Sequence, residues 1–289
     1  MNTEYDVPVM QLCKYFSIHR SHYYYWLKRH QSKKSIEDKK MEVELIWLYD
    51  HYEMIYGYRR LHIELEKKMK IKVNIKRVHR LCKQLGLSSI IRRKRNLGYN
   101  TFKEQISENI LGQNFNASAP NQKWVTDITE TKVGNNKHYI CVVQDLFNRE
   151  ITSYSVSKRA NTELISDAML KAFNKNKNVK NIIIHSDQGT QFTSYKYKEL
   201  LKEHEQIPSN SRAGNCLDNA VVENFFSHLK TEMLYINEIK SEKELLESIK
   251  RYIYFYNNKR VQIKTKKTPL ELRNEYYENY YENNKSNVN

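Results

Sequence analysis

The fold is decided by residues 123–157, KWVTDITETKVGNNKHYICVVQDLFNREITSYSVS. Along 123–133, apolar or β-branched residues alternate with polar ones, a pattern typical of a strand with one face toward a core. The segment GNN at 134–136 suits a hairpin turn. Residues 138–147 and 150–157 repeat the apolar, β-branched character of the first run. The stretch therefore predicts three consecutive antiparallel strands.

The segments that follow predict an α/β order. We expect a helix at 161–174, and the apolar run NIIIHSD at 181–187 predicts a buried strand. Further helices are expected at 193–204, 217–233 and 242–257. Strands and helices in this order are typical of a mixed sheet covered by helices.

Residues 41–86 predict three helices, because apolar residues recur there every three or four positions. The stripes are formed by Met41, Leu45 and Leu48, then Leu61, Leu65 and Met69, then Ile75, Val78, Cys82 and Leu85. Asn74 is a suitable N-cap for the third helix, and Gly86 stands where a helix end favours glycine. The opposite face of that helix carries Lys76, Arg77, Arg80 and Lys83. A basic last helix predicts a helix-turn-helix DNA reader, although a small helical bundle with a solvated face fits the same pattern.

Two flanking segments extend this region. Residues 9–29 predict two short helices around a turn at 17–19. The segment IRRKRNLGYN at 91–100 has four basic residues, among them Arg92 and Arg93. A run of like charge suits a linker that lies along phosphates.

The chain as a whole is strongly basic. Its 289 residues include 49 Lys and Arg against 33 Asp and Glu, a net charge of +16. This surplus favours a polyanionic partner, and DNA, a ribosome or an anionic membrane surface would each satisfy it. A mean hydropathy of −0.81 and the lack of an apolar run of about 20 residues argue against a spanning helix. With no secretory signal pattern and abundant Lys, Asn, Ile and Tyr, we expect a cytoplasmic bacterial protein.

The cysteines and the one paired histidine motif do not predict a zinc site. Four cysteines, Cys13, Cys82, Cys141 and Cys216, lie far apart without a CxxC pair. This spacing argues against a disulfide scaffold and against a cysteine-based zinc site. His19 and His22 form an HxxH without nearby cysteines, so we expect them to be ordinary helix and turn residues.

Three carboxylates are candidates for a catalytic site. Asp127 lies inside the first strand, where Asp is disfavoured unless it faces water or holds a cation. Asp187 follows the buried strand at its carboxyl end, where ligands gather in α/β sheets but where Asp also commonly opens a turn. Glu223 lies on a polar helical stripe with Lys230 two turns later, and a surface ion pair would account for both. Each residue alone is explained by an ordinary structural role.

The three carboxylates are more specific as a set. Two Asp residues from strands and a Glu from a helix supply all-oxygen ligation with open water positions, as Mg²⁺ or Mn²⁺ requires. Phosphoryl transfer on DNA uses two such ions about 3.5–4 Å apart, one at the attacking oxygen and one at the leaving oxygen. The set therefore predicts metal-dependent phosphoryl transfer.

Three stretches of the chain resemble the catalytic blocks of one enzyme family. They are WVTDIT at 124–129, HSDQGTQFTS at 185–194 and SRAGNCLDNAVVENFFSHLKTE at 211–232. They are similar to the blocks of DDE transposases, and more narrowly of integrase-like insertion-sequence transposases whose second reading frame encodes the catalytic part. In that family 35 residues separate the second Asp from the Glu, as between Asp187 and Glu223. A basic residue seven positions after the Glu is also usual, and here it is Lys230.

The resemblance covers nearly the whole chain. Residues 56–68 and 73–87 resemble the family's helix-turn-helix region, and 254–273 resemble its C-terminal block. The resemblance implies an α/β fold, a ribonuclease H-like catalytic core with a mixed five-stranded sheet, preceded by a helical helix-turn-helix region. The divisions expected are a helix-turn-helix-like segment at 1–32, a helix-turn-helix DNA-binding region at 38–98, a linker at 99–119, the catalytic core at 120–236 and a helical basic region at 237–289.

The resemblance also implies an activity. A transposase of this family cuts DNA at the ends of an insertion sequence and joins the freed 3′-hydroxyl to another phosphodiester. The catalytic residues and ligands of two Mg²⁺ ions, for which Mn²⁺ could substitute, would be Asp127, Asp187 and Glu223. The DNA contacts expected are Lys230, Lys76, Arg77, Arg80, Lys83, Arg92 and Arg93. The implied partners are the inverted-repeat ends and target DNA, other copies in a homo-oligomer on DNA, and an upstream-frame protein, with no membrane.

Two other functions fit the same residues. A nuclease or junction resolvase on this fold would cut DNA without joining it. A non-catalytic DNA-binding regulator would be a decayed transposase copy, but the presence of all three carboxylates weighs against decay. Strand-transfer products from a pre-cleaved DNA end would distinguish the transposase from the nuclease.

Overall fold

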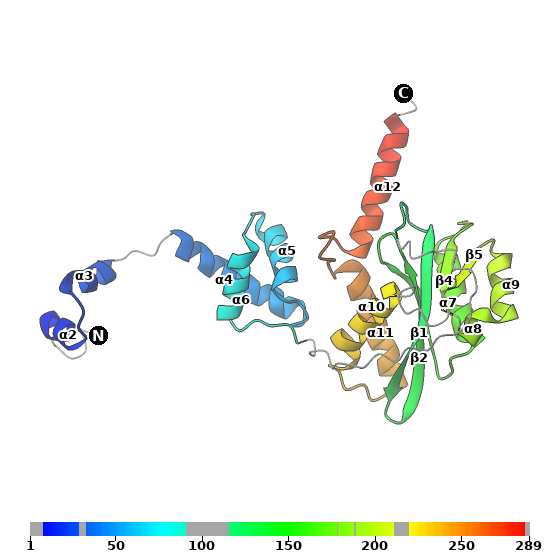
Figure 1. Ribbon diagram of the computed structural model, residues 1–289, viewed down its shortest axis with the longest axis horizontal. Coiled ribbons are helices and arrows are strands. Elements are labelled where there is room, and N and C mark those ends of the chain that lie inside the picture. The colour runs from blue at the N-terminus through cyan, green and yellow to red at the C-terminus, as the bar shows by residue number, and fades with distance from the viewer. Residues whose placement is uncertain are drawn as a thin grey trace. The chain divides into compact units, whose positions relative to one another are not determined.

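The computed structural model describes residues 8–28, 33–90, 116–177, 179–187, 189–210 and 220–286. The chain divides into two compact units, Met1–Ser89 and Ile90–Asn289, which are described separately (Figure 1). The predicted DNA contacts Arg92 and Arg93 and most of the predicted linker at 99–119 lie outside the described residues.

The first unit is helical, as its apolar pattern predicts. Helices α2 (Val9–Tyr15) and α3 (Arg20–Lys28) precede α4 (Lys33–His51), α5 (Tyr58–Met69) and α6 (Ile75–Gln84). The Asn74 side chain caps α6 by accepting the Lys76 backbone N–H at 2.8 Å. Gly86, with a φ of +69°, ends α6 in the left-handed conformation that glycine adopts without strain. The stripes of α4, α5 and α6 meet in a small core that includes Met41, Leu45, Leu61, Leu65, Val78 and Leu81.

The second unit is built on a mixed sheet of five strands in the order β3-β2-β1-β4-β5. The strands are β1 (Lys123–Val133), β2 (Asn136–Asp145), β3 (Ile151–Ser157), β4 (Ile183–Ser186) and β5 (Ile207–Asn210). Strands β1, β2 and β3 pair in antiparallel fashion, while β4 is parallel to β1 and β5 is parallel to β4. This order and these directions are those of a ribonuclease H-like core, which confirms the predicted fold class.

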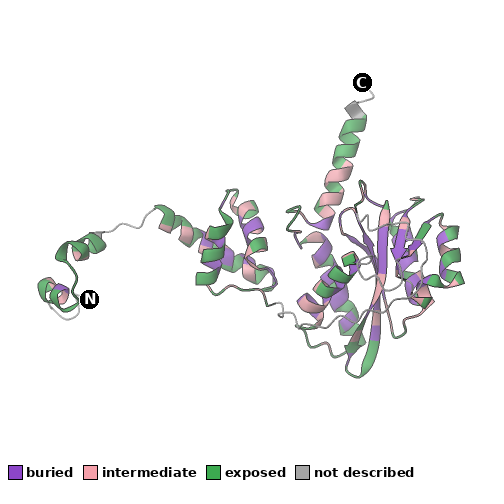
Figure 2. Cartoon of the chain, viewed as in Figure 1, coloured by how far each residue is buried: buried purple, intermediate pink, exposed green. Residues whose placement is uncertain are grey.

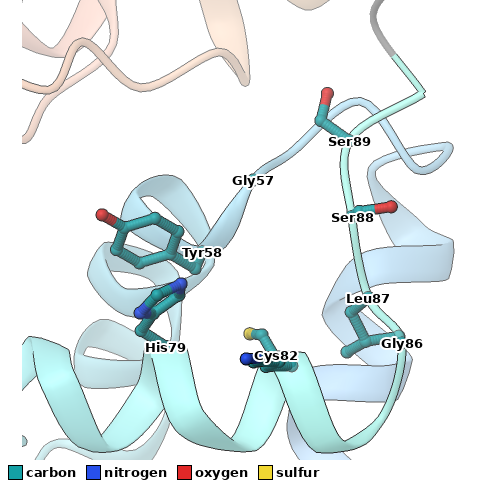
Figure 3. Close-up of a pocket in the computed structure, with 9 residues that line it drawn as sticks. Gly57, Tyr58, His79, Cys82, Gly86, Leu87, Ser88 and Ser89 are labelled. Carbon is teal, nitrogen blue, oxygen red and sulfur yellow. The ribbon is translucent and has the colours of Figure 1, made fainter.

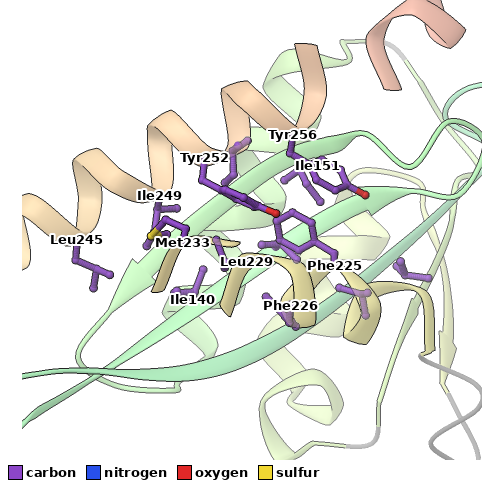
Figure 4. Packing of buried hydrophobic residues seen from close by; sticks show 14 of the residues in the cluster. Ile140, Ile151, Phe225, Phe226, Leu229, Met233, Leu245, Ile249, Tyr252 and Tyr256 are labelled. Carbon is purple, nitrogen blue, oxygen red and sulfur yellow. The ribbon is translucent and has the colours of Figure 1, made fainter. Parts of the chain in front are cut away.

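Helices cover both faces of this sheet. Strand alternation turns Trp124 toward a cluster that includes α7 (Thr162–Lys175), α8 (Thr190–Thr193) and α9 (Tyr195–Glu203). It turns Val125 toward a second cluster. That cluster is formed with α10 (Ala220–Leu229), the π-helical turn η2 (Lys230–Leu234) and α11 (Glu242–Asn258) (Figure 4). Figure 2 shows the buried residues concentrated along the strands and between the sheet and these helices.

The C-terminal part of the chain belongs to the same unit as the sheet. Helix α11 is capped at its start by Ser241, whose hydroxyl accepts the Glu244 N–H, and it packs into the same buried cluster as α10. Helix α12 (Pro269–Ser286) is anchored near its start, where Arg273 Nη1 donates to Glu150 Oε2 at 3.0 Å. The predicted basic region is divided in charge: residues 259–267 hold five Lys and Arg, whereas α12 holds four Glu against one Arg and one Lys.

Two elements differ from the sequence-based expectation. Strand β5 has no counterpart among the strands that the sequence pattern predicts. The helix expected at 217–233 changes at Lys230 from α-helical to π-helical turns. Residues 211–219, where that helix was expected to begin, lie outside the described part of the chain. Among the described residues, no helix is both long enough and apolar enough to cross a bilayer.

Candidate active site

Asp127 lies on β1, on the face of the sheet that α10 covers. Its neighbour two residues earlier, Val125, is in the α10 cluster, and alternation turns both side chains the same way. Asp127 is half-buried, and its Oδ1 atom accepts the backbone N–H of Ile128 at 2.7 Å. The predicted strand therefore holds a carboxylate on its helix-covered face.

Asp187 comes directly after β4, and the sheet register places it beside Asp127. Strands β1 and β4 pair in parallel, with Lys123 opposite Ile183 and Val125 opposite His185. Asp127 and Asp187 each lie two residues beyond the last pair, Val125 and His185, and therefore at the same end of the paired segment. The Oδ1 atom of Asp187 also accepts the Gly189 N–H at 2.9 Å, which orients the carboxylate at the strand end.

Glu223 is supplied by α10. Its helix is fixed to the sheet by Val222, Phe225 and Leu229, all buried in the α10 cluster. Glu223 is exposed and lies in the first turn of α10 as the structure describes it. Lys230, the first residue of η2, is half-buried.

Electrostatics link these four side chains. The pKa of Asp127 is raised to about 7, first by burial and then by the negative charges of Asp187 and Glu223, while the Ile128 N–H and Lys230 oppose the shift. Burial and the charge of Asp187 raise the pKa of Glu223. Burial lowers the pKa of Lys230, against the charge of Asp127. The structure thus brings the three carboxylates and Lys230 within electrostatic reach of one another.

The three carboxylates, as the structure describes them, are not arranged around a common metal position. Within the described ranges, no three His, Cys, Asp or Glu side chains are placed so that they could hold a metal ion as they stand. The donor set nevertheless suits a hard cation, because all three groups offer oxygen and their charges disfavour one another. A cation between them would relieve the repulsion that raises the pKa of Asp127.

The basic residues predicted on α6 fall into two groups. Arg77 Nε donates to Asp38 Oδ1 at 2.7 Å, and Arg80 Nη2 donates to Asp38 Oδ2 at 2.6 Å. Lys76 and Lys83 are exposed and make no ion pair with another described residue. Half of the predicted basic face thus holds α6 against α4, and half is open to a partner.

Comparison with known proteins identifies the family. Two families, each described as an integrase core domain, match residues 117–216 and 223–285, and an HTH-like domain family matches residues 35–95. InsK, a putative transposase for insertion sequence element IS150 from Escherichia coli, is 40% identical over 271 residues, which are 93% of this chain and 95% of that protein. The chain belongs to the insertion-sequence transposase family.

Other members and structures are more distant. InsF, a transposase for insertion sequence IS3A from Escherichia coli, is 32% identical over 251 residues, 86% of this chain and 87% of that protein. The solved catalytic core domain of HTLV-2 integrase in complex with magnesium is 21% identical, with a TM-score of 0.45, and the match covers 54% of this chain and 98% of that one. The family assignment confirms the resemblance predicted from the three catalytic blocks.

Two features of the site were not predicted. A side chain at Gly189 would crowd the site, because a Cβ atom there would lie 3.0 Å from Asp187 Oδ1. Glu232, two residues after Lys230, is fully buried and paired with Arg260. The glycine is visible in the HSDQG sequence as a residue beside the carboxylate, but nothing local predicts a pair separated by 28 residues.

Proposed function

We propose that this transposase cuts DNA at the ends of an insertion sequence and joins the freed 3′-hydroxyl to another phosphodiester, with Asp127, Asp187 and Glu223 as its catalytic residues. The observation that carries the proposal is the convergence of Asp127, Asp187 and Glu223: burial raises the pKa of Asp127, and the charges of the other two carboxylates raise it further. Among the described residues no Lys or Arg forms an ion pair with these carboxylates, so the acidic cluster is poorly suited to bind DNA unaided. It is well suited to hold divalent cations that bind DNA phosphate.

The residues that would hold the metal are the three carboxylates. Two Mg²⁺ ions, replaceable by Mn²⁺, would supply activation of the attacking oxygen and stabilisation of the leaving oxygen. Asp127 and Asp187 are fixed by neighbouring strands, while Glu223 is exposed and rotates its side chain toward them in the proposal. This rotation of Glu223 is needed because the three carboxylates, as the structure places them, do not surround a common metal position.

The remaining residues bind and orient DNA in the proposal. Lys230, half-buried beside the carboxylates, contacts a phosphate close to the bond that is cut. Lys76 and Lys83, together with Arg92 and Arg93, contact DNA in the proposal, whereas Arg77 and Arg80 act mainly through Asp38. The partners are the inverted-repeat ends and target DNA, further copies of the chain assembled on that DNA, and an upstream-frame protein.

The test is a strand-transfer assay with the full chain and Mg²⁺. The substrate is a duplex with the DNA that borders the coding frame, offered intact and with its 3′ end already cut. We expect cleaved and joined products, and we expect Asp127→Asn, Asp187→Asn and Glu223→Gln to abolish both. Asp167→Asn is the matched control, because Asp167 lies on α7, on the opposite face of the sheet, paired with Lys171.

Each outcome has a defined meaning. Cutting without joining would favour a nuclease over a transposase. An Asp127→Asn chain that cuts as fast as the wild type would overturn the catalytic assignment. A gel shift on the same duplex should show that this variant still retains DNA, since the substitution removes a carboxylate and not a cation.

A further inference from the structure

Two features of the described chain lie outside the residues assigned to the reaction. One is a hollow of about 460 Å³ in the first unit, lined by Gly57, Tyr58, His79, Cys82, Lys83 and residues 86–89 (Figure 3). The other is a pair of side chains at the end of β5, Ser209 and Asn210, whose hydrogen bonds lie at or beside Asp187. These two residues share the second unit with the three carboxylates. The end of β5 therefore bears directly on the proposed reaction.

The strand pairing of β4 stops before it reaches Asp187. Strands β1 and β4 pair as far as Val125 and His185, and β4 and β5 pair as far as Ser186 and Asn210. Asp187 is thus two residues beyond the last pair on the β1 side and one residue beyond it on the β5 side. Ladder hydrogen bonds fix the course of a strand, and Asp187 lies past them on both sides. The direction of its side chain must be set by other contacts.

The Asn210 side chain provides such a contact. Its Nδ2 atom donates to the backbone carbonyl oxygen of Asp187 at 3.2 Å and to Ser186 Oγ at 3.4 Å. A carbonyl oxygen can only accept, so the amide nitrogen of Asn210, and not its amide oxygen, faces Asp187. Asn210 is half-buried and belongs to the last pair of the β4–β5 ladder. Its amide therefore extends the hold of β5 by one residue, onto the residue that carries the proposed ligand.

Two neighbouring contacts hold the same segment before and after Asp187. Before it, His185 Nδ1 lies 3.0 Å from Ser209 Oγ, and both side chains are buried. After it, the Gly189 N–H donates to Asp187 Oδ1 at 2.9 Å. The bond from Asn210 lies between these two contacts and acts on the main chain of Asp187 itself.

We propose that Asn210 is a positioning residue for the joining reaction. Its amide holds the Asp187 carbonyl so that the Asp187 carboxylate faces the metal that it would share with Asp127, and it acts on metal and DNA only through Asp187. The inference rests on the proposed function in taking Asp187 as a metal ligand. Without the amide, the main chain at Asp187 turns more freely, and its carboxylate spends less time in the binding direction. Loss of such supporting hydrogen bonds typically costs about 10–100-fold in metal affinity or activity.

The test removes the amide donor in the full chain. Asn210→Leu keeps a similar side-chain size without a donor, and Asn210→Ala removes the amide without adding bulk. The first measurement is the Mg²⁺ concentration that gives half-maximal strand transfer from a duplex of the bordering DNA whose 3′ end is already cut. We expect both variants to need about ten- to a hundredfold more Mg²⁺ than the wild type, with a smaller loss of rate when Mg²⁺ is saturating.

A second measurement needs neither metal nor DNA. Hydrogen exchange followed by mass spectrometry reports how often the segment around Asp187 opens, through peptides that cover residues 186–191. Because the bond from Asn210 is a single hydrogen bond, its loss should speed exchange of this segment by roughly two- to tenfold. Peptides from β2 should exchange as in the wild type, since β1 separates β2 from β4 in the sheet.

The matched control is Gln206→Leu, because the Gln206 amide holds the other end of β4. Its Oε1 atom accepts the Ile182 N–H at 2.8 Å, and its Nε2 atom donates to two backbone carbonyls. Gln206 is 7% exposed, so its loss should lower the Tm more than the loss of the half-buried Asn210 does. It should nevertheless leave the Mg²⁺ requirement and the exchange of residues 186–191 near the wild-type values, because its contacts lie at the start of β4.

Asn210 variants that match the wild type in Mg²⁺ requirement or in exchange would overturn the proposal. It is also overturned if Gln206→Leu changes both quantities as much as they do, because the effect would then be a general loosening of β4. A wild-type chain that joins no DNA refutes the proposed catalysis, and the exchange comparison then still decides whether Asn210 fixes Asp187.

Discussion

The buried ion pair between Glu232 and Arg260 makes a quantitative prediction about the second unit. The side chains are 0% and 5% exposed, and they lie next to the cluster that fixes α10 to the sheet. Arg260 donates from Nε to Glu232 Oε2 at 2.8 Å and from Nη2 to Oε1 at 2.6 Å, and the Tyr252 hydroxyl donates to Oε2 at 2.9 Å. We compare Arg260→Met alone with the double variant Glu232→Met/Arg260→Met.

The single substitution should be far more costly than the double one. Arg260→Met removes two charge-assisted hydrogen bonds and leaves the Glu232 carboxylate buried without its cation, which costs about 3–5 kcal/mol. Two such bonds at about 1.5–3 kcal/mol each give about 3–6 kcal/mol, a similar range. In a unit of this size, 1 kcal/mol corresponds to about 2–4 °C, so the Tm should fall by roughly 6–20 °C. The double variant removes both charges and should stay within about 1–2 kcal/mol of the wild type.

The measurement is urea unfolding followed by tryptophan fluorescence. Trp124 is 0% exposed on β1 and reports on the second unit, while Trp26 and Trp47 are exposed in the first. A double variant as unstable as Arg260→Met would refute the reasoning, because the loss would then not arise from an uncompensated charge.

The same double variant tests a link to the active site. Glu232 lies in η2, the π-helical turn in which Tyr235 N donates to Lys230 O at 2.8 Å, and such turns occur frequently at functional sites. Without the ion pair this turn loses its polar anchor. We therefore expect the folded double variant to join DNA more slowly than the wild type. When Lys230→Gln is added to it, the strand-transfer rate should fall little below that of Lys230→Gln alone. Fully additive losses would show that the pair does not act through Lys230.

Three further predictions concern individual residues. Gly189→Ala places a Cβ atom 3.0 Å from Asp187 Oδ1, so strand-transfer rates should fall by roughly ten- to a hundredfold with little change in Tm; an unchanged rate would contradict a close fit there. The pKa of Asp145 is raised to about 6, mainly by burial, so the folded chain binds this proton more tightly than the unfolded chain does. Protonation therefore stabilises the fold as pH falls from about 6 to about 4, and Asp145→Asn should flatten the urea midpoint across that window. Burial raises the pKa of Cys82 to about 11 and that of Cys141 to about 12, so iodoacetamide at about pH 8 should label neither until urea unfolds the chain, as mass spectrometry would show.

The parts of the fold that sequence predicted are those whose cause is local. The alternation along 123–133 gives β1 with the predicted bounds, because each side chain's face follows from its position alone. The stripe of α4 is buried as expected, and so are Val78 and Cys82 in the middle of the α6 stripe, whereas Ile75 at its start is exposed. Asn74 and Gly86 cap the two ends of α6 as predicted. Asp127 could be recognised as unusual for the same reason, since a carboxylate within a half-buried strand needs an explanation.

The parts that sequence did not predict depend on distant partners. Strand β5, with the sequence IPSN, is four residues long and contains Pro208, so no local pattern distinguishes it from a loop. It is a strand because it pairs with β4. Arg77 belonged to the predicted basic face of α6, but Asp38, which engages it, is 39 residues away. Helix periodicity predicts which side of α6 is polar and cannot predict which cations another helix has already paired.

The active site combines a rigid part and an adjustable part. Asp127 and Asp187 each lie two residues beyond the parallel pairing of β1 with β4, so their positions depend directly on the folded sheet. Glu223 is exposed near the start of α10, which Val222, Phe225 and Leu229 pack onto the sheet and which a polar contact holds at its other end. Glu232 and Arg260 provide that hold from the following turn. Substitutions at the Glu232–Arg260 pair should therefore shift Glu223 and Lys230 and slow strand transfer, while Asp127 and Asp187 stay in place. The position of α10 then decides whether the site is complete.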